Sequence, residues 1–151
     1  MSFQKKIPVF LLVPFLLVGC MGKHIERDTL IGQLDVFGVE LFTDVDYRQI
    51  KGFTSTEEPC LRGYERSFDD LDLIIGYGFD KTIRKITTRN AGTSLFGIRP
   101  GMTFDEGREK ILTAGFAEYH PPFTYRSIGY TLKFLVGSDN KIFGLTLEAI
   151  D

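Results

Sequence analysis

The stretch Gly129–Ala149, GYTLKFLVGSDNKIFGLTLEA, consists of two apolar-polar runs on either side of a turn. Thr131 and Lys133 alternate with apolar residues, which is the pattern of a strand with one buried face. The apolar face of this strand is formed by Tyr130, Leu132, Phe134 and Val136. Residues 137–140 are typical of a hairpin turn, and residues 141–147 supply the return strand. The stretch therefore predicts an antiparallel hairpin with one face in the core.

The same pattern occurs earlier in the chain, at an offset of 59 residues without a gap. Residues 71–77 predict the outgoing strand, GFDK at residues 78–81 the turn, and residues 83–87 the return. Ile83 and Ile86 are three residues apart, so a bulge near Arg84 or Lys85 is needed to keep both in the core. Identical residues at this offset include Leu73/Leu132, Gly78/Gly137, Asp80/Asp139, Ile83/Ile142 and Thr87/Thr146. We interpret the offset as an internal repeat.

A helix is predicted before the second hairpin, in TFDEGREKILTAGF at residues 103–116. Thr103 and Glu106 have the spacing of a capping box, in which each side chain accepts a backbone N–H of the first turn. Gly115 followed by Phe116 predicts a Schellman-type end. The counterpart in the first half, TDVDYRQIKG at residues 43–52, predicts a shorter helix.

Each half thus predicts a short extended stretch, a helix, a loop and an antiparallel hairpin. The loops are residues 53–67 and 117–128. Two helices packed on one face of a shared antiparallel sheet make an α+β two-layer sandwich of tandem helix-plus-hairpin repeats. Residues 30–151 are expected to form one domain of two repeats, about 30–90 and 91–151, because roughly 60 residues bury too little surface to be stable alone.

The N-terminal segment begins with Lys5 and Lys6 and continues with IPVFLLVPFLLVG, 13 uncharged residues. A membrane-spanning helix needs about 20 apolar residues. The apolar region of an export signal has about 7 to 15. Residues 1–19 therefore predict a signal peptide, with an uncleaved N-terminal anchor as the alternative.

The segment ends in Leu17-Val18-Gly19-Cys20, which resembles the lipobox of bacterial lipoproteins. The resemblance implies that the Cys20 thiol receives a diacylglycerol, that cleavage makes Cys20 the first residue, and that its amino group is acylated with a fatty acid such as palmitate. The protein would then be anchored in the cell membrane or outer membrane, with its domain on the extracytoplasmic side. Residues 20–29 form the tether, and the nine residues after Cys20 span at most about 30 Å.

A second resemblance covers about twenty residues. GIRPGMTFDEGREKILTAGF, residues 97–116, is similar to the helix opening of the SmpA/OmlA (BamE-like) envelope lipoproteins. In those proteins helices pack on a small antiparallel sheet, and the beta-lactamase inhibitor proteins look like a tandem version of that unit. The resemblance implies a fold and names no partner.

Composition and residue types give no sign of an enzyme. The net charge of −2 argues against a nucleic-acid binder, which needs a basic stripe to neutralise phosphates. Cys60 and His120 are the candidates for a nucleophile and base, but nothing supplies an orienting third group. The acidic residues near Asp70 lack the spacing of a calcium loop, and no Cys/His spacing of a zinc site occurs. We therefore predict no catalytic residues, no metal and no cofactor.

The loop AEYHPPFTYRSIGY, residues 117–130, is the candidate partner-binding segment. Aromatic anchors in loops are typical of protein interfaces. They are equally typical of rings that close a core, and both interpretations stand. The candidate binding residues are Tyr119, Phe123 and Tyr125.

The sequence predicts a membrane-anchored, non-catalytic protein-binding module with a scaffold or assembly role, by the fold resemblance. The first alternative is an inhibitor or immunity-type lipoprotein that blocks a secreted enzyme or toxin. The second is a protein that binds a small apolar ligand between sheet and helices. The expected partners are the membrane, through Cys20, and another envelope protein.

Overall fold

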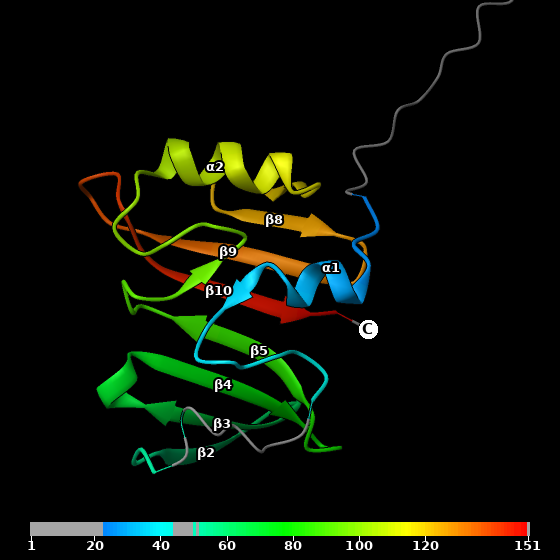
Figure 1. Ribbon diagram of the computed structural model, residues 1–151, viewed down its shortest axis with the longest axis vertical. Coiled ribbons are helices and arrows are strands. Elements are labelled where there is room, and N and C mark those ends of the chain that lie inside the picture. The colour runs from blue at the N-terminus through cyan, green and yellow to red at the C-terminus, as the bar shows by residue number, and fades with distance from the viewer. Residues whose placement is uncertain (1–22, 44–49, 51, 151) are drawn as a thin grey trace, which may run out of the picture.

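The computed structural model describes residues 23–43, 50 and 52–150, and these are mainly β-strands (Figure 1). In chain order the elements are α1 (Arg27–Ile31), β1 (Leu34–Asp35), β2 (Thr56–Cys60), β3 (Gly63–Phe68), the 3-10 helix η1 (Asp69–Leu71), β4 (Leu73–Gly78), β5 (Ile83–Thr88), β6 (Ser94–Leu95), α2 (Phe104–Thr113), β7 (Ala117–His120), β8 (Thr124–Ser127), β9 (Tyr130–Val136) and β10 (Ile142–Ala149).

Eight of these strands form one antiparallel sheet in the order β2-β3-β4-β5-β10-β9-β8-β7. The first half of the chain supplies four neighbouring strands, the second half supplies the other four, and β5 pairs with β10 at the centre. The short strands β1 and β6 pair with each other separately. Both helices lie on the same side of the sheet (Figure 1). The core lies between the helices and the sheet. It contains Leu30 and Ile111 of the helices together with Ile75, Ile86 and Leu145 of the strands.

The predicted α+β sandwich of helix-plus-hairpin repeats is wrong. Residues 53–67 and 117–128, predicted as loops, contain the strands of two further hairpins, β2–β3 and β7–β8. These hairpins form the two edges of the sheet, and every residue of β2 is exposed. An edge strand without a buried face carries no apolar alternation, so the period-2 pattern could not reveal it. The described part of the chain is a mostly β structure with two α-helices.

The two predicted hairpins are confirmed as β4–β5 and β9–β10. The bulge expected near Arg84 or Lys85 is also present, since Gly76 pairs with Lys85 while Tyr77 pairs with Ile83, which leaves Arg84 as the extra residue. In the second hairpin the pairing shifts in the same way, and Phe143 is the extra residue. The bulges turn these two side chains away from the ladder.

Corresponding turns in the two halves share backbone geometry at the offset of 59 residues. Phe37 and Gly38 have φ of 52° and 73°, and Phe96 and Gly97 have φ of 55° and 70°. The β4–β5 and β9–β10 turns are closed by equivalent bonds, from Gly78 N to Thr82 O (2.8 Å) and from Gly137 N to Lys141 O (2.9 Å). In the central strand pair Thr87 lies opposite Thr146, its counterpart, so an approximate two-fold axis passes through this pair.

Helix α2 has the predicted ends. Thr103 and Glu106 form the capping box in both directions. After the helix, Gly115 N bonds to Leu112 O and Phe116 N bonds to Ile111 O, which is the Schellman pattern. Gly107 lets the helix approach the sheet, because a Cβ at this position would collide with Ile142 Cδ1.

The other predicted helix, at residues 43–52, falls mainly on residues outside those that the structure describes. The short helix α1, by contrast, was not predicted. Its five residues carry one buried side chain, Leu30, which is too short a pattern for helical periodicity to be visible.

Candidate functional site

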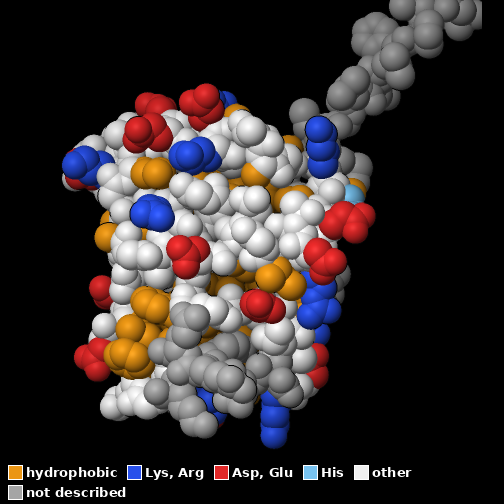
Figure 2. All heavy atoms as spheres, in the orientation of Figure 1, with side chains coloured by type: hydrophobic (Ala, Val, Ile, Leu, Met, Phe, Trp, Pro, Cys, Tyr) orange, Lys and Arg blue, Asp and Glu red, His pale blue; other side chains and the backbone are white. Residues whose placement is uncertain are grey.

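Among the described residues, neither α-helix covers the face of the eight-stranded sheet opposite α1 and α2, which we call the open face (Figure 1). Strand alternation places small and polar residues on it, among them Gly76, Thr87, Gly144 and Thr146. The opposite, helix-bearing face mixes acidic and basic side chains, and hydrophobic ones gather near η1 (Figure 2). Neither α-helix of the described residues covers the open face (Figure 1), which leaves it available for binding.

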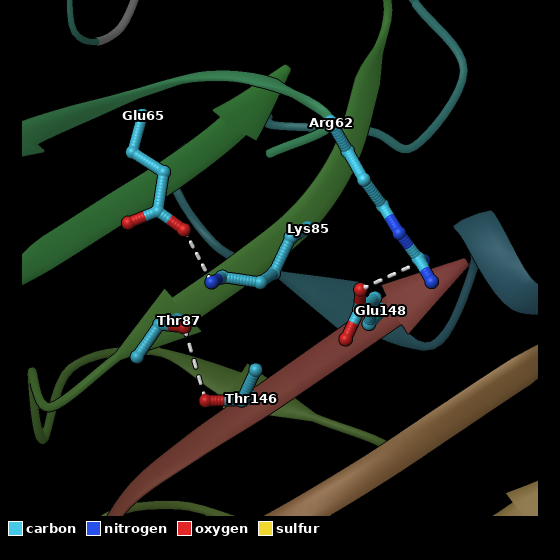
Figure 3. A network of polar contacts seen from close by, with 6 residues as sticks. All are labelled: Arg62, Glu65, Lys85, Thr87, Thr146 and Glu148. Atoms are coloured by element: carbon cyan, nitrogen blue, oxygen red, sulfur yellow. Dashed lines mark hydrogen bonds and ion pairs between the residues drawn. The ribbon is translucent and has the colours of Figure 1, made fainter. Parts of the chain in front are cut away.

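Three polar contacts cross the centre of the open face (Figure 3). Lys85 of β5 forms an ion pair with Glu65 of β3. The Thr87 and Thr146 hydroxyls are 3.0 Å apart and share a hydrogen bond on the approximate two-fold axis.

The third contact joins Arg62 to Glu148, with 3.4 Å between Nη1 and Oε1. These side chains are 73% and 40% exposed, so the pair contributes at most about 1 kcal/mol to stability. The Thr87–Thr146 and Arg62–Glu148 contacts connect the two halves of the chain across the β5–β10 junction, and the Lys85–Glu65 pair lies within the first half.

A groove of about 960 Å³ lies beside these contacts, at the end of the sheet that holds the β2–β3 and β4–β5 turns. Its lining includes Cys60, Leu61, Phe79, Lys85 and Glu148. The Cys60 thiol is free and exposed. His120, the base considered for it, lies on β7 at the other edge of the sheet, seven strand spacings or about 34 Å away along the sheet. The two residues cannot act as a nucleophile and base pair within one chain.

Among residues 23–43, 50 and 52–150, no group of three or more His, Cys, Asp or Glu is placed to hold a metal ion. The acidic residues 69–72 lie on η1 and the turn that follows it. Asp80 serves the β4–β5 turn, where the backbone and hydroxyl of Thr82 and the Arg84 guanidinium donate to it. These donors lower the pKa of Asp80 to about 2. Its carboxylate is committed to the turn.

The three predicted partner-binding residues are not equivalent. Tyr119 is 47% exposed on β7, and Phe123 is 39% exposed in the β7–β8 turn, where its ring meets Phe104 of α2 edge-on with 5.4 Å between the ring centroids. Tyr125 has no exposed surface. Its hydroxyl donates to Pro122 O at 2.9 Å, and burial raises the pKa of its phenol. Tyr125 is therefore a core residue that supports this end of the sheet and presents no ring to a partner.

The corresponding region of the first half is more buried. Tyr64 is half-buried and stacks on Tyr77 with 4.7 Å between ring centroids, and Phe68 is buried. Phe68 therefore belongs to the core and Tyr64 packs against it, so the first half has no counterpart of the exposed Tyr119 ring at these two positions.

Two basic residues lie beside the exposed Tyr119 ring. The sequence analysis did not identify them as binding residues. The Arg126 guanidinium lies 4.9 Å from the centroid of the Tyr119 ring, which is a cation–π contact. Lys133 is exposed on the same face of the neighbouring strand β9. Among the described residues neither has an acidic partner within ion-pair distance. Strand alternation could have identified both residues, since Arg126 lies between buried Tyr125 and Ser127, and Lys133 lies between buried Leu132 and Phe134. We call Tyr119, Arg126 and Lys133 the β7–β9 patch.

A similar contact lies at the end of the same face. The Arg89 guanidinium is 6.0 Å from the centroid of the Phe143 ring, and Phe143 is 49% exposed at the bulge of β10. The second half of the open face therefore carries aromatic rings covered by basic side chains.

Cys20, the predicted lipidation site, lies outside the described residues. None of the helices described in the structure is long and apolar enough to cross a membrane. No protein-family model, no curated protein and no solved structure matches this chain.

Proposed function

We propose that this chain is a lipid-anchored envelope protein of a bacterium that binds another protein and has no catalytic role. The anchor is the diacylglycerol on Cys20, within the Leu-Val-Gly-Cys motif that ends the N-terminal apolar segment. The domain lies on the extracytoplasmic side of the cell membrane or outer membrane. A scaffold or assembly role is the first choice.

The observation that carries the binding role is the β7–β9 patch on the open face of the sheet. Tyr119 keeps 47% of its surface exposed although it packs on Arg126, so a partner can bury the ring without displacing it from its support. Tyrosine and arginine are the residue types most enriched among the residues that dominate binding energy. The paired strands β8 and β9 hold Arg126 and Lys133, which lowers the entropy lost on binding, and Tyr119 lies at the shift in pairing between Glu118 and His120 of β7.

The charge of the patch specifies the kind of partner. Arg126 and Lys133 lie on adjacent strands without an acidic partner among the described residues. A protein surface that presents acidic residues would pair with both cations and cover the Tyr119 ring beside Arg126. The same chemistry suits an envelope scaffold partner and a secreted enzyme that an inhibitor would block.

The test is site-specific photo-crosslinking in intact cells. A photo-reactive phenylalanine analogue at Thr131, half-buried opposite Arg126, reports on the open face, and the same analogue at Glu109, exposed on α2, reports on the opposite face. We expect a discrete protein adduct from position 131 that is absent from position 109 and is weakened by Arg126→Glu. Identical adducts from both positions, or none from position 131, would contradict the proposal. Mass spectrometry of the adduct separates a membrane-assembly partner from a secreted enzyme.

A further inference from the structure

The chain is fixed to the domain very close to the predicted lipid. Lys23 N donates to Gly115 O at 2.9 Å, Ile128 N donates to Lys23 O at 3.4 Å, and His24 forms a bridge with Ile128. Only two residues separate Lys23 from Cys20, so the two Cα atoms are at most about 11 Å apart. This distance is much shorter than the 30 Å expected from the sequence, and it brings the Lys23–Ile128 corner to the bilayer.

Several turns lie at the same end of the sheet as this corner. The β2–β3 and β4–β5 turns are adjacent, since Gly63 pairs with Gly78. The end of β10 meets the β8–β9 turn through a bond from Ile150 N to Gly129 O of 2.8 Å. In Figure 1 the first described residues, the β8–β9 connection, the end of β10 and the β4–β5 turn all lie on the right.

Three large hydrophobic side chains among the described residues at this end of the sheet are exposed to solvent. Leu61 of the β2–β3 turn is 98% exposed, Phe79 of the β4–β5 turn is 82% exposed, and Ile128 is 48% exposed. Two cations accompany them, Lys23 and Lys81, and neither has an acidic partner within ion-pair distance among the described residues.

The turn at the opposite end shows that Phe79 is not needed for the turn itself. The β9–β10 turn has the same backbone, with Lys81 and Asn140 at φ of 64° and 59°. At the offset of 59 residues, Ser138 occupies the place of Phe79 and Asn140 the place of Lys81. One geometry thus carries an apolar and a basic residue beside the tether and two polar residues far from it.

We propose that the end of the sheet formed by the 61–62, 79–81 and 128–129 turns lies on the bilayer, with Leu61, Phe79 and Ile128 inserted among the lipid headgroups. This proposal rests on the lipid anchor of the proposed function. Apolar side chains enter the interface to a depth of about 5 to 10 Å, and basic side chains beside them bind anionic headgroups. The strands then run toward the membrane, and the open face with the β7–β9 patch points sideways along its surface.

The test uses the absence of tryptophan from the chain. Full-length lipidated protein is prepared with a single tryptophan, as Leu61→Trp, Phe79→Trp or Ser138→Trp, and placed in vesicles of phosphatidylethanolamine and phosphatidylglycerol. Brominated acyl chains quench tryptophan that enters the interface. We expect a blue-shifted, quenched emission from positions 61 and 79. We expect the emission of water-exposed tryptophan, without quenching, from position 138.

Unquenched emission at positions 61 and 79, or equal quenching at all three positions, would overturn the proposal. The three substituted positions are exposed, so the substitutions leave the core unchanged, and two independent reporters guard against one that misfolds. Failure of the anchor itself is seen separately, because protein without a lipid would not float with the vesicles. Hydrogen exchange of the unsubstituted protein gives a second measurement, with slower exchange expected in the 61–62 and 79–81 turns in vesicles than in detergent.

Discussion

Tyr125 distinguishes a core residue from a binding residue in the same segment, and its replacement tests the fold at the β7–β8 edge. The ring is fully buried and lies 5.2 Å from the Phe134 ring, measured between centroids. Tyr125→Ala truncates this buried aromatic side chain, and such a change costs about 3 to 5 kcal/mol. For a domain of this size that corresponds to a fall in Tm of about 12 to 20 °C. Tyr125→Phe keeps the ring and removes the hydroxyl, which donates to Pro122 O and interacts with the Arg108 guanidinium, and should cost about 0.5 to 1.5 kcal/mol.

Tyr119→Ala is the matched control, because this tyrosine is 47% exposed on the edge strand β7, next to the strand that carries Tyr125. Its loss removes one exposed cation–π contact and should cost less than about 1 kcal/mol. Urea unfolding of the detergent-solubilised protein is followed by far-ultraviolet circular dichroism. It gives the free energies of unfolding of Tyr125→Ala, Tyr125→Phe and Tyr119→Ala relative to the natural chain. If Tyr125→Ala were as stable as Tyr119→Ala, the assignment of Tyr125 to the core would be refuted.

Four further predictions concern local structure. Thr103→Ala removes the N-cap of α2 and should lower the free energy of unfolding by about 1 kcal/mol in urea titrations. Hydrogen bonds from the Thr103 hydroxyl and backbone lower the pKa of Glu106. The contribution of Glu106 to stability is therefore present above the unfolded pKa of about 4.3 and is lost as the pH falls through the lower folded pKa. Glu106→Gln should reduce the fall of Tm with decreasing pH in this range, and an unchanged fall would contradict the capping role. Gly129 has φ of 87° with open space around it, so Gly129→Ala should cost about 1 to 3 kcal/mol in backbone strain. Gly63→Ala should cost more in the same assay, because its Cβ would also collide with Tyr77 O.

The hairpins and the capped helix could be predicted because their signals are local. Alternating apolar residues specify which face of β9 is buried, and the spacing of Ile83 and Ile86 is sufficient to predict the bulge at Arg84. Thr103 and Glu106 predict the start of α2 for the same reason, since a capping box depends on four consecutive residues.

The edge hairpins and the site could not be predicted in the same way. The residues of β2 are exposed on both sides, and Pro59 within it resembles a loop residue, although proline is tolerated at the edge of a sheet. The β7–β9 patch depends on which strands are neighbours, which is a tertiary property. Sequence alone gave aromatic residues in one segment but did not separate buried Tyr125 from exposed Tyr119.

The anchor at Cys20 is the claim on which the orientation and the envelope location both depend. The most direct measurement is metabolic labelling with a fatty acid that carries a clickable group, followed by mass spectrometry of the N-terminal peptide, for the natural chain and for Cys20→Ala. We expect a labelled protein that begins at a diacylglyceryl-modified Cys20, and an unlabelled, unprocessed Cys20→Ala variant. Equal labelling of both chains, or an unmodified Cys20 peptide from the natural chain, would contradict the anchor.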